Sequence, residues 1–514
     1  MGELEEVLAL FVAAVALAGA ARRVGAPYPV FLAVGGALLA FFPFAPSFTI
    51  PPELALALFV APVLLDAAYD ASLRDLKDNW APVMSLVVFA VALTTAAVAI
   101  VVRYLIPEMP LAPAIALGAI VAPPDAVAAT AVLRPLRPPQ RLLTILEGES
   151  LLNDATALLI YRVAIASVST NKVSWSGAAP MFLLAVAGSV IVGPALGWIT
   201  MRWLSAVRHT PTQIILQFVT TFSVWLLAEG IGLSGVLTMV SYAIYVAQGA
   251  PARTPARARI PTYAVWETVV FALNILAFIF IGLQVRPILS ALEPGQFSEY
   301  LVVAIAVLIT CIVVRFAWHM SFNAVLRLYY QRFGYQPKRP MMRPTFGSGL
   351  VISWSGMRGI VSLAAALALP AGFPYRDLIL LTAFSVVLGT LVLQGLTLKP
   401  LLRWLNLKDG DPVGQEVSAA RERALRAALA SFQDDKSPAA DAVRKELTAH
   451  LHSTAGREAA SAAASHADIH ITALEAARNV VHEMRANQEI GDDAFHQIEE
   501  ELDWLEMASP SPDR

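Results

Sequence analysis

Four polar side chains lie close together within the apolar segment 140–168. At about 100° per residue they share an arc of about 140° on one helix face, and they are Glu149, Ser150, Asn153 and Asp154. Burying a charge at the centre of a bilayer costs roughly 2.5 kcal/mol or more. The cluster therefore predicts a functional site facing the protein interior. For Asn153 and Asp154, the alternative is capping or packing at a helix junction.

The carboxylate of Asp154 predicts a binding site for a small alkali cation, because carboxylate oxygens are hard ligands. Removing a carboxylate from water favours its protonated form, so the same oxygen can hold a proton instead. A group that holds either a proton or a cation, but not both, is the chemical requirement of an exchanger.

Two further aspartates occur in apolar segments. Asp125 follows Pro123 and Pro124, and it is expected either to line a cavity opposite Asp154 or to accept hydrogen bonds from backbone amides at a helix junction. Asp66 is a third carboxylate of this kind, and its alternative position is near the membrane interface.

Arg358 also lies in an apolar segment and requires a buried anion, because a guanidinium group stays charged at any accessible pH. We expect Glu149 to be its partner, and we expect this pair to be structural, holding two helices in register. Arg315 is a similar buried cation, for which the sequence indicates no partner.

The elements that position these residues are transmembrane helices. The chain has 514 residues, of which 57% are hydrophobic and 15% charged, and its mean hydropathy is +0.62, which excludes a soluble protein. Thirteen apolar runs are long enough to cross a core of ~30 Å. They cover residues 4–21, 27–44, 52–71, 80–105, 111–133, 140–168, 178–204, 212–230, 233–249, 262–287, 297–328, 346–370 and 376–405.

The loops between these runs predict the orientation of the chain. Alternate loops hold 20 and four basic residues, so the positive-inside rule places the N-terminus outside and the C-terminal tail in the cytoplasm. An odd number of spans fits two inverted six-helix repeats, about 4–168 and 212–405, joined by a linking helix at 178–204.

Helix breakers occur at matching places in the two predicted repeats. The fifth span contains Ala122-Pro-Pro-Asp125, and the twelfth contains Ser353-Trp-Ser-Gly-Met-Arg-Gly359. Proline removes backbone donors and glycine, here Gly356 and Gly359, loosens a helix, so backbone groups at both places must find other partners. We therefore expect two broken helices that cross at a central ion site.

The composition changes near residue 409. Residues 1–408 form the predicted transmembrane domain, whereas residues 409–514 hold 21 acidic against 10 basic residues and read as an acidic, helical cytoplasmic tail. His466 and His470 are spaced i,i+4, which suits pH sensing or metal binding, with a solvated helix surface as the alternative. We expect the tail to regulate the membrane domain.

Several classes of function lack their motifs. The sequence contains no phosphate-binding glycine loop, no nucleophile triad and no cysteine-based zinc motif. We therefore expect neither an enzyme nor an ATP-driven pump, no cofactor and no nucleic acid partner.

The sixth-span sequence Gly148-Glu-Ser-Leu-Leu-Asn-Asp-Ala155 closely resembles the signature of the cation:proton antiporter-1 family, the NhaP-like and NHE-like sodium/proton exchangers. Residues 354–359 and 124–127 resemble the two broken helices of that family, and the resemblance covers roughly residues 5–405. It implies a thirteen-span fold with a dimer domain and a core domain, a homodimer in the lipid bilayer, and elevator-like alternating access.

The resemblance also implies roles for individual residues. Asp154 matches the carboxylate that binds Na⁺ or a proton, and Asn153 matches the residue that positions it. Ser150 and Asp125 match positions in or beside the site, and the family pattern pairs Glu149 with Arg358.

Two positions depart from the family pattern. Relatives usually have Thr-Asp-Pro at the fifth-span break, where this chain has Pro123-Pro124-Asp125 and so lacks the hydroxyl ligand. Relatives commonly have Glu where this chain has the shorter Asp66, which can alter ion preference.

We predict a sodium/proton antiporter of a bacterial inner membrane, with Li⁺ or K⁺ as possible further substrates. Relatives that carry two adjacent aspartates are electrogenic, so the Asn-Asp pair implies exchange of one cation for one proton. A K⁺/H⁺ exchanger is the alternative within transport. A cation channel gated by the tail and a membrane sensor are the alternatives from other classes.

Overall fold

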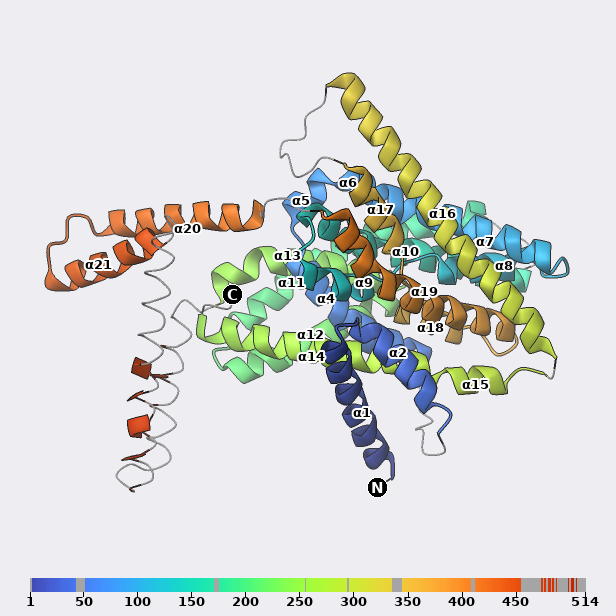
Figure 1. The fold of residues 1–514 in the computed structure, drawn as a ribbon, viewed down its shortest axis with the longest axis horizontal. Helices are drawn as coiled ribbons and strands as arrows, with labels where there is room; N and C mark the ends of the chain where they lie inside the picture. Colours follow the sequence, from blue (N-terminus) through green and yellow to red (C-terminus); the bar gives the residue numbers. More distant parts are fainter. Residues whose placement is uncertain are drawn as a thin grey trace. The chain divides into compact units, whose positions relative to one another are not determined.

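The computed structural model describes residues 2–42, 51–170, 175–254, 256–293, 295–334, 344–407 and 412–453, with scattered positions from 473 to 505. Every regular element among these residues is a helix, as the sequence predicts (Figure 1). Backbone contacts divide the chain into two units, Met1–Asp409 and Gly410–Arg514. His466 and His470 lie outside the described residues.

The helices of the first unit follow one another through short connections. Those up to the middle of the unit are α1 (Gly2–Val24), α2 (Tyr28–Leu39), α3 (Pro52–Ala55), η1 (Leu56–Val60), α4 (Ala61–Asp70), α5 (Leu73–Asp78), α6 (Trp80–Met84), η2 (Ser85–Ala90), α7 (Val91–Leu105), α8 (Leu111–Val121), α9 (Ala126–Leu133), η3 (Arg134–Leu136), α10 (Gln140–Thr170) and α11 (Trp175–Leu204). The remainder are α12 (Thr210–Gly230), α13 (Gly235–Arg253), α14 (Ala256–Leu283), α15 (Val285–Ser290), α16 (Gln296–Phe333), α17 (Phe346–Trp354), α18 (Ile360–Leu367) and α19 (Arg376–Leu405).

These helices agree with the predicted spans. Helical residues occupy all thirteen predicted ranges where the structure describes them. Within the described residues, eight helices are long and apolar enough to cross a membrane, and Tyr28–Leu39 and Gly235–Ala250 are shorter apolar helices. The chain is therefore an all-helical membrane protein. The count of thirteen spans, the inverted repeats and the orientation of the termini stay predictions.

Both expected helix breaks are present. α8 ends at Val121 and α9 begins at Ala126, so the Pro-Pro-Asp sequence lies in the extended segment between them. α17 ends at Trp354 and α18 begins at Ile360, with residues 355–359 forming the second break. Both breaks occur where the sequence places prolines and glycines, as their backbone chemistry predicts.

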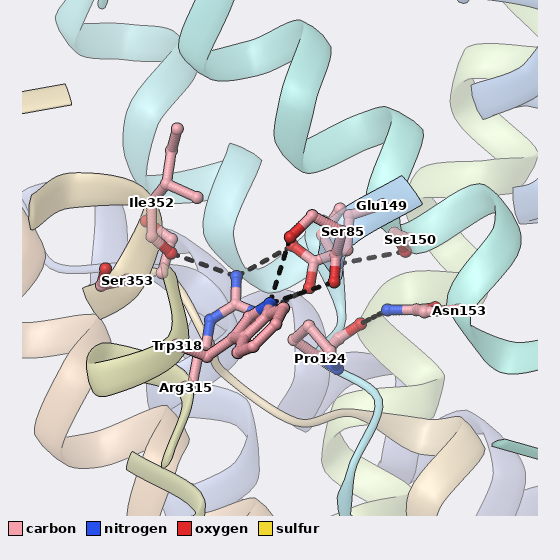
Figure 2. Close-up of polar contacts among 12 residues, drawn as sticks. Ser85, Pro124, Glu149, Ser150, Asn153, Arg315, Trp318, Ile352 and Ser353 are labelled. Carbon is pink, nitrogen blue, oxygen red and sulfur yellow. Dashed lines mark hydrogen bonds and ion pairs between the residues drawn. The ribbon is translucent and has the colours of Figure 1, made fainter. Parts of the chain in front are cut away.

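Two further irregularities were not expected. The turns η1 and η2 are π-helical and interrupt the third and fourth predicted spans. A π-helical turn changes the hydrogen-bond partners of the backbone, and such turns are frequent at functional sites. At η2, the indole Nε1 of Trp318 donates to the carbonyl oxygen of Ser85 at 3.2 Å and to its Oγ at 3.1 Å (Figure 2). At η1, Phe59 and Val60 line a cavity described below.

α2 and α14 pack with their backbones almost in contact. A Cβ atom added to Gly36 would lie 2.4 Å from the carbonyl oxygen of Ile279, and one added to Gly282 would lie 2.2 Å from that of Ala33. Only glycine permits this approach. The two helices therefore form one tightly packed pair.

The second unit begins with two helices, α20 (Pro412–Ser431) and α21 (Pro438–Ser453). In the turn between them, Asp435 Oδ1 accepts a hydrogen bond from the backbone N–H of Ser437 at 2.8 Å. This bond lowers the pKa of the Asp435 carboxyl below its usual value. Arg444 also donates to the carbonyl oxygen of Asp435 at 2.9 Å, and its guanidinium lies 5.9 Å from the ring centroid of Phe432.

Candidate functional site

The two helix breaks touch each other. The backbone N–H of Asp125 donates to the carbonyl oxygen of Met357 at 2.6 Å. Arg358 Nε donates to the carbonyl oxygen of Val121, the last residue of α8, at 3.0 Å. The unpaired backbone groups of one break are thus satisfied by the other break, which fixes the crossing point.

The polar face of α10 holds the first break from the side. Asn153 Nδ2 donates to the carbonyl oxygen of Pro124 at 3.0 Å (Figure 2). Ser150 Oγ accepts from the backbone N–H of Ala126 at 3.3 Å. Asn153 Oδ1 is buried and has no hydrogen-bond partner among the described residues. This arrangement favours a positioning role for Asn153.

Both interpretations of Asp125 apply in the structure. Its Oδ1 accepts from the backbone N–H of Val127 at 2.8 Å and so caps the N-terminus of α9. The carboxylate also lies directly against Gly359, where an added Cβ would be 1.7 Å from Oδ2. Gly359 is therefore required for the close approach of Asp125, in addition to loosening the helix.

Asp154 faces a cavity at this crossing point. The cavity has an open volume of ≈ 580 Å³ and is lined by residues of η1, α4, α9, α10, α14, α18 and the two breaks. Asp125, Ser150 and Asp154 all line it. Within the described residues, no group donates a hydrogen bond to the Asp154 carboxylate, although its residue is only 7% exposed. A buried carboxylate without a protein donor is free to bind a proton or a cation.

Asp154 also lines a second, smaller cavity with an open volume of ≈ 210 Å³. Tyr161, two turns further along α10, lines this cavity too, and its hydroxyl donates to the carbonyl oxygen of Ala365 at 2.8 Å. This bond ties α10 to α18 next to the carboxylate.

The expected pair of Glu149 with Arg358 is wrong. Arg315 of α16 binds Glu149 through two parallel hydrogen bonds, Nη1 to Oε1 at 2.5 Å and Nη2 to Oε2 at 2.8 Å (Figure 2). Nη2 of Arg315 also donates to the carbonyl oxygen of Ile352 at 3.1 Å. Arg315 can approach Glu149 with both nitrogens, and this geometry is the strongest that a guanidinium and a carboxylate form.

Arg358 instead binds backbone oxygens. Besides the carbonyl of Val121, it donates to the carbonyl of Gly356 in its own break, and its backbone N–H donates to Thr390 Oγ1 at 3.0 Å. Carbonyl oxygens freed by the helix breaks thus take the place of the expected carboxylate. The charge of Arg358 still interacts with those of Glu149 and Arg315.

The remaining predicted residue, Asp66, lies apart from this group. It is half-buried in α4 and is not among the described residues that line either cavity. Its charged neighbours are Asp70, Arg134 and Glu267. Its position therefore gives no support to a direct role beside Asp154.

Sequence reasoning missed two polar residues at the site. Thr390 supports Arg358, and Asn274 of α14 lines the larger cavity. Asn274 carried a signal in the sequence, because it is an isolated amide in a long apolar run. A search restricted to charged residues overlooks it.

Comparison with known proteins agrees with this architecture. A family model described as "Sodium/hydrogen exchanger, transmembrane" matches residues 8–404. The chain belongs to this family. A relative from Bacillus pumilus, described as a "Sodium, potassium, lithium and rubidium/H(+) antiporter", is 29% identical over 424 residues. The match covers 79% of this chain but only 62% of that protein.

Two other members of the sodium/hydrogen exchanger family show the extent of the likeness. The uncharacterized Na(+)/H(+) exchanger YjcE of Escherichia coli is 27% identical over 541 residues, and the match covers 96% of each chain. The solved structure of the sodium proton antiporter MjNhaP1 from Methanocaldococcus jannaschii has the same fold, with a TM-score of 0.58 at 18% identity, covering 79% of this chain and 99% of that one.

Proposed function

We propose that this sodium/hydrogen exchanger family member is a secondary antiporter that exchanges Na⁺, and also Li⁺ or K⁺, for H⁺. The observation that carries the proposal is the Asp154 carboxylate, which is buried, faces the larger cavity and accepts no hydrogen bond from the described residues. The Bacillus pumilus relative is described as an antiporter of several alkali cations, which supports the same class of substrate.

The chemistry follows from competition for one oxygen pair. When Asp154 holds a proton, it is neutral and has little attraction for a cation. When it loses the proton, its negative charge attracts a cation that enters the cavity, with Ser150 Oγ and Asp125 as neighbouring oxygen ligands. Because both substrates need the same carboxylate, the protein carries one or the other across the membrane.

The same geometry supports exchange of one cation for one proton. Asp125 also lines the cavity, but one of its oxygens already caps α9. A single uncommitted carboxylate moves no net charge in a complete cycle. In proteoliposomes, the exchange rate at fixed ion gradients should therefore not change when a K⁺ diffusion potential is imposed. A strong response to that potential would contradict this stoichiometry.

The wider arrangement completes the proposal. Residues 1–408 perform transport in a bacterial inner membrane, as a homodimer with elevator-like movement of the broken helices, and the acidic tail 409–514 regulates it. The coupling of the two breaks by direct hydrogen bonds supports their movement as one body. No cofactor is needed for this chemistry.

The test compares three proteins in everted vesicles. Wild type should dissipate a preformed proton gradient on addition of Na⁺, Li⁺ or K⁺, whereas Asp154→Asn should not. Glu299→Gln is the matched control, because it makes the same change of carboxylate to amide at an exposed position in the first turn of α16. Undiminished exchange by Asp154→Asn would refute the assignment. Cation flux without proton countertransport would favour the channel.

A further inference from the structure

Asn274 is a polar residue in an otherwise apolar stretch of α14, in the sequence Phe271-Ala-Leu-Asn-Ile-Leu-Ala-Phe278. Its side chain makes no hydrogen bond with the described residues. An amide in the apolar part of a membrane protein is costly unless its polar atoms have partners. The amide of Asn274 therefore needs a partner that is not another side chain of the described protein.

The position of Asn274 shows where that partner lies. Asn274, Ala277 and Phe278 are spaced i, i+3 and i+4, so they form one face of α14, and all three line the cavity that Asp154 lines. Most other lining residues are apolar. Of the described lining residues, the polar ones are Asp125, Ser150, Asp154, Asn274 and Ser362.

We propose that the side-chain oxygen of Asn274 is a further ligand for the transported cation and contributes to the choice among alkali cations. The inference rests on the proposed antiport function and deepens it. An amide oxygen is a neutral, hard ligand, so it replaces part of the hydration shell of a cation that enters this mostly apolar cavity. It does not bind a proton at physiological pH, so it acts on the cation and leaves the proton to Asp154.

The packing of α14 sets this ligand apart from the others. Asn274 lies a little more than one turn before Ile279, which belongs to the close contact between α14 and α2. Asp154 and Ser150 belong to α10, whose polar face is bonded to the first helix break. The cation thus meets ligands from two separately packed groups of helices. A selective contact between such groups depends on their distance, and alkali cations differ in radius.

The test uses the full-length protein in proteoliposomes, with Na⁺, Li⁺ and K⁺ supplied separately. Asn274→Leu keeps a similar size and removes the amide oxygen. It should raise the KM for Na⁺ at least about tenfold, equivalent to about 1.4 kcal/mol. It should also change the order of preference among the three cations, while the maximal rate at saturating Na⁺ and its pH dependence stay close to wild type.

Two further variants keep the test decisive. Asn274→Ser retains one oxygen in a smaller side chain and should have an intermediate KM; it decides the matter if Asn274→Leu does not fold. Thr268→Val is the matched control on α14, because it removes an exposed hydroxyl that bonds only to the carbonyl of Ala264 in its own helix. Wild-type KM values and an unchanged cation order in both Asn274 variants would overturn the inference.

A binding measurement separates this inference from the proposed function. Cation binding to the native state raises its melting temperature, so the Na⁺ concentration that gives half of the maximal shift reports affinity without transport. Asn274→Leu should need about tenfold more Na⁺ than wild type. If Asp154→Asn exchanges normally, the proposed function has failed. If Asp154→Asn is inactive and Asn274→Leu binds Na⁺ like wild type, only the role of Asn274 has failed.

Discussion

The buried pair of Glu149 and Arg315 leads to a prediction about stability in which the two partners are not equivalent. Their side chains are 2% and 3% exposed, and two parallel hydrogen bonds join them. Removing one partner of a buried pair leaves an uncompensated charge and typically costs about 3–5 kcal/mol. Both Glu149→Gln and Arg315→Met should therefore destabilise the protein strongly.

The position of Arg358 makes the two losses unequal. Its charge interacts with both members of the pair, and Gly356 lies close to the side chains of both Arg315 and Arg358. Glu149→Gln removes the carboxylate that both cations share. Arg315→Met removes one cation but leaves Arg358 near the carboxylate. We therefore expect Glu149→Gln to be the more destabilising change.

Replacing both partners should be less harmful than removing Glu149 alone. The double variant Glu149→Leu with Arg315→Met leaves neither charge of the pair buried, and exchanging a whole buried pair for apolar residues is often nearly neutral. Melting temperatures of the detergent-solubilised protein should fall in the order wild type, double variant, Arg315→Met and Glu149→Gln. Single variants that melt like wild type, or a double variant whose loss equals the sum of the single losses, would refute this reasoning.

Three other changes test the remaining contacts. Gly359→Ala should abolish exchange while the protein still inserts in the membrane, because its new Cβ would overlap the Asp125 carboxylate; wild-type rates in vesicles would contradict this. Arg162→Ala breaks a pair with Glu229, 2.6 Å long, whose side chains are 54% and 36% exposed. It should cost at most about 1 kcal/mol, seen as a small change in melting temperature, and a large drop would show that the pair is more than a surface contact. Truncation after residue 408 should change the pH profile of exchange but not its cation preference, and an identical profile would remove the regulatory role of the tail.

The sequence by itself determined the class of the protein and the place of its site. An isolated carboxylate in an apolar segment is expensive, so the polar face from Glu149 to Asp154 had to face the interior. Prolines lack the N–H that a helix requires, and glycines weaken a helix, so both breaks were predictable from residue type alone. These are local properties of the chain, and they do not depend on which helix lies next to which.

Only the tertiary structure decided which residues are partners. Arg315 and Arg358 both lie in apolar helices and both need an anion, and nothing in the sequence says which of them can reach Glu149 with two nitrogens. Asn274 entered the site because the packing of α14 turned its amide toward Asp154, and Asp66 left it because α4 placed it among other charges. A burial cost follows from a single residue, whereas a contact depends on distance and direction between residues far apart in the chain, and only packing determines these.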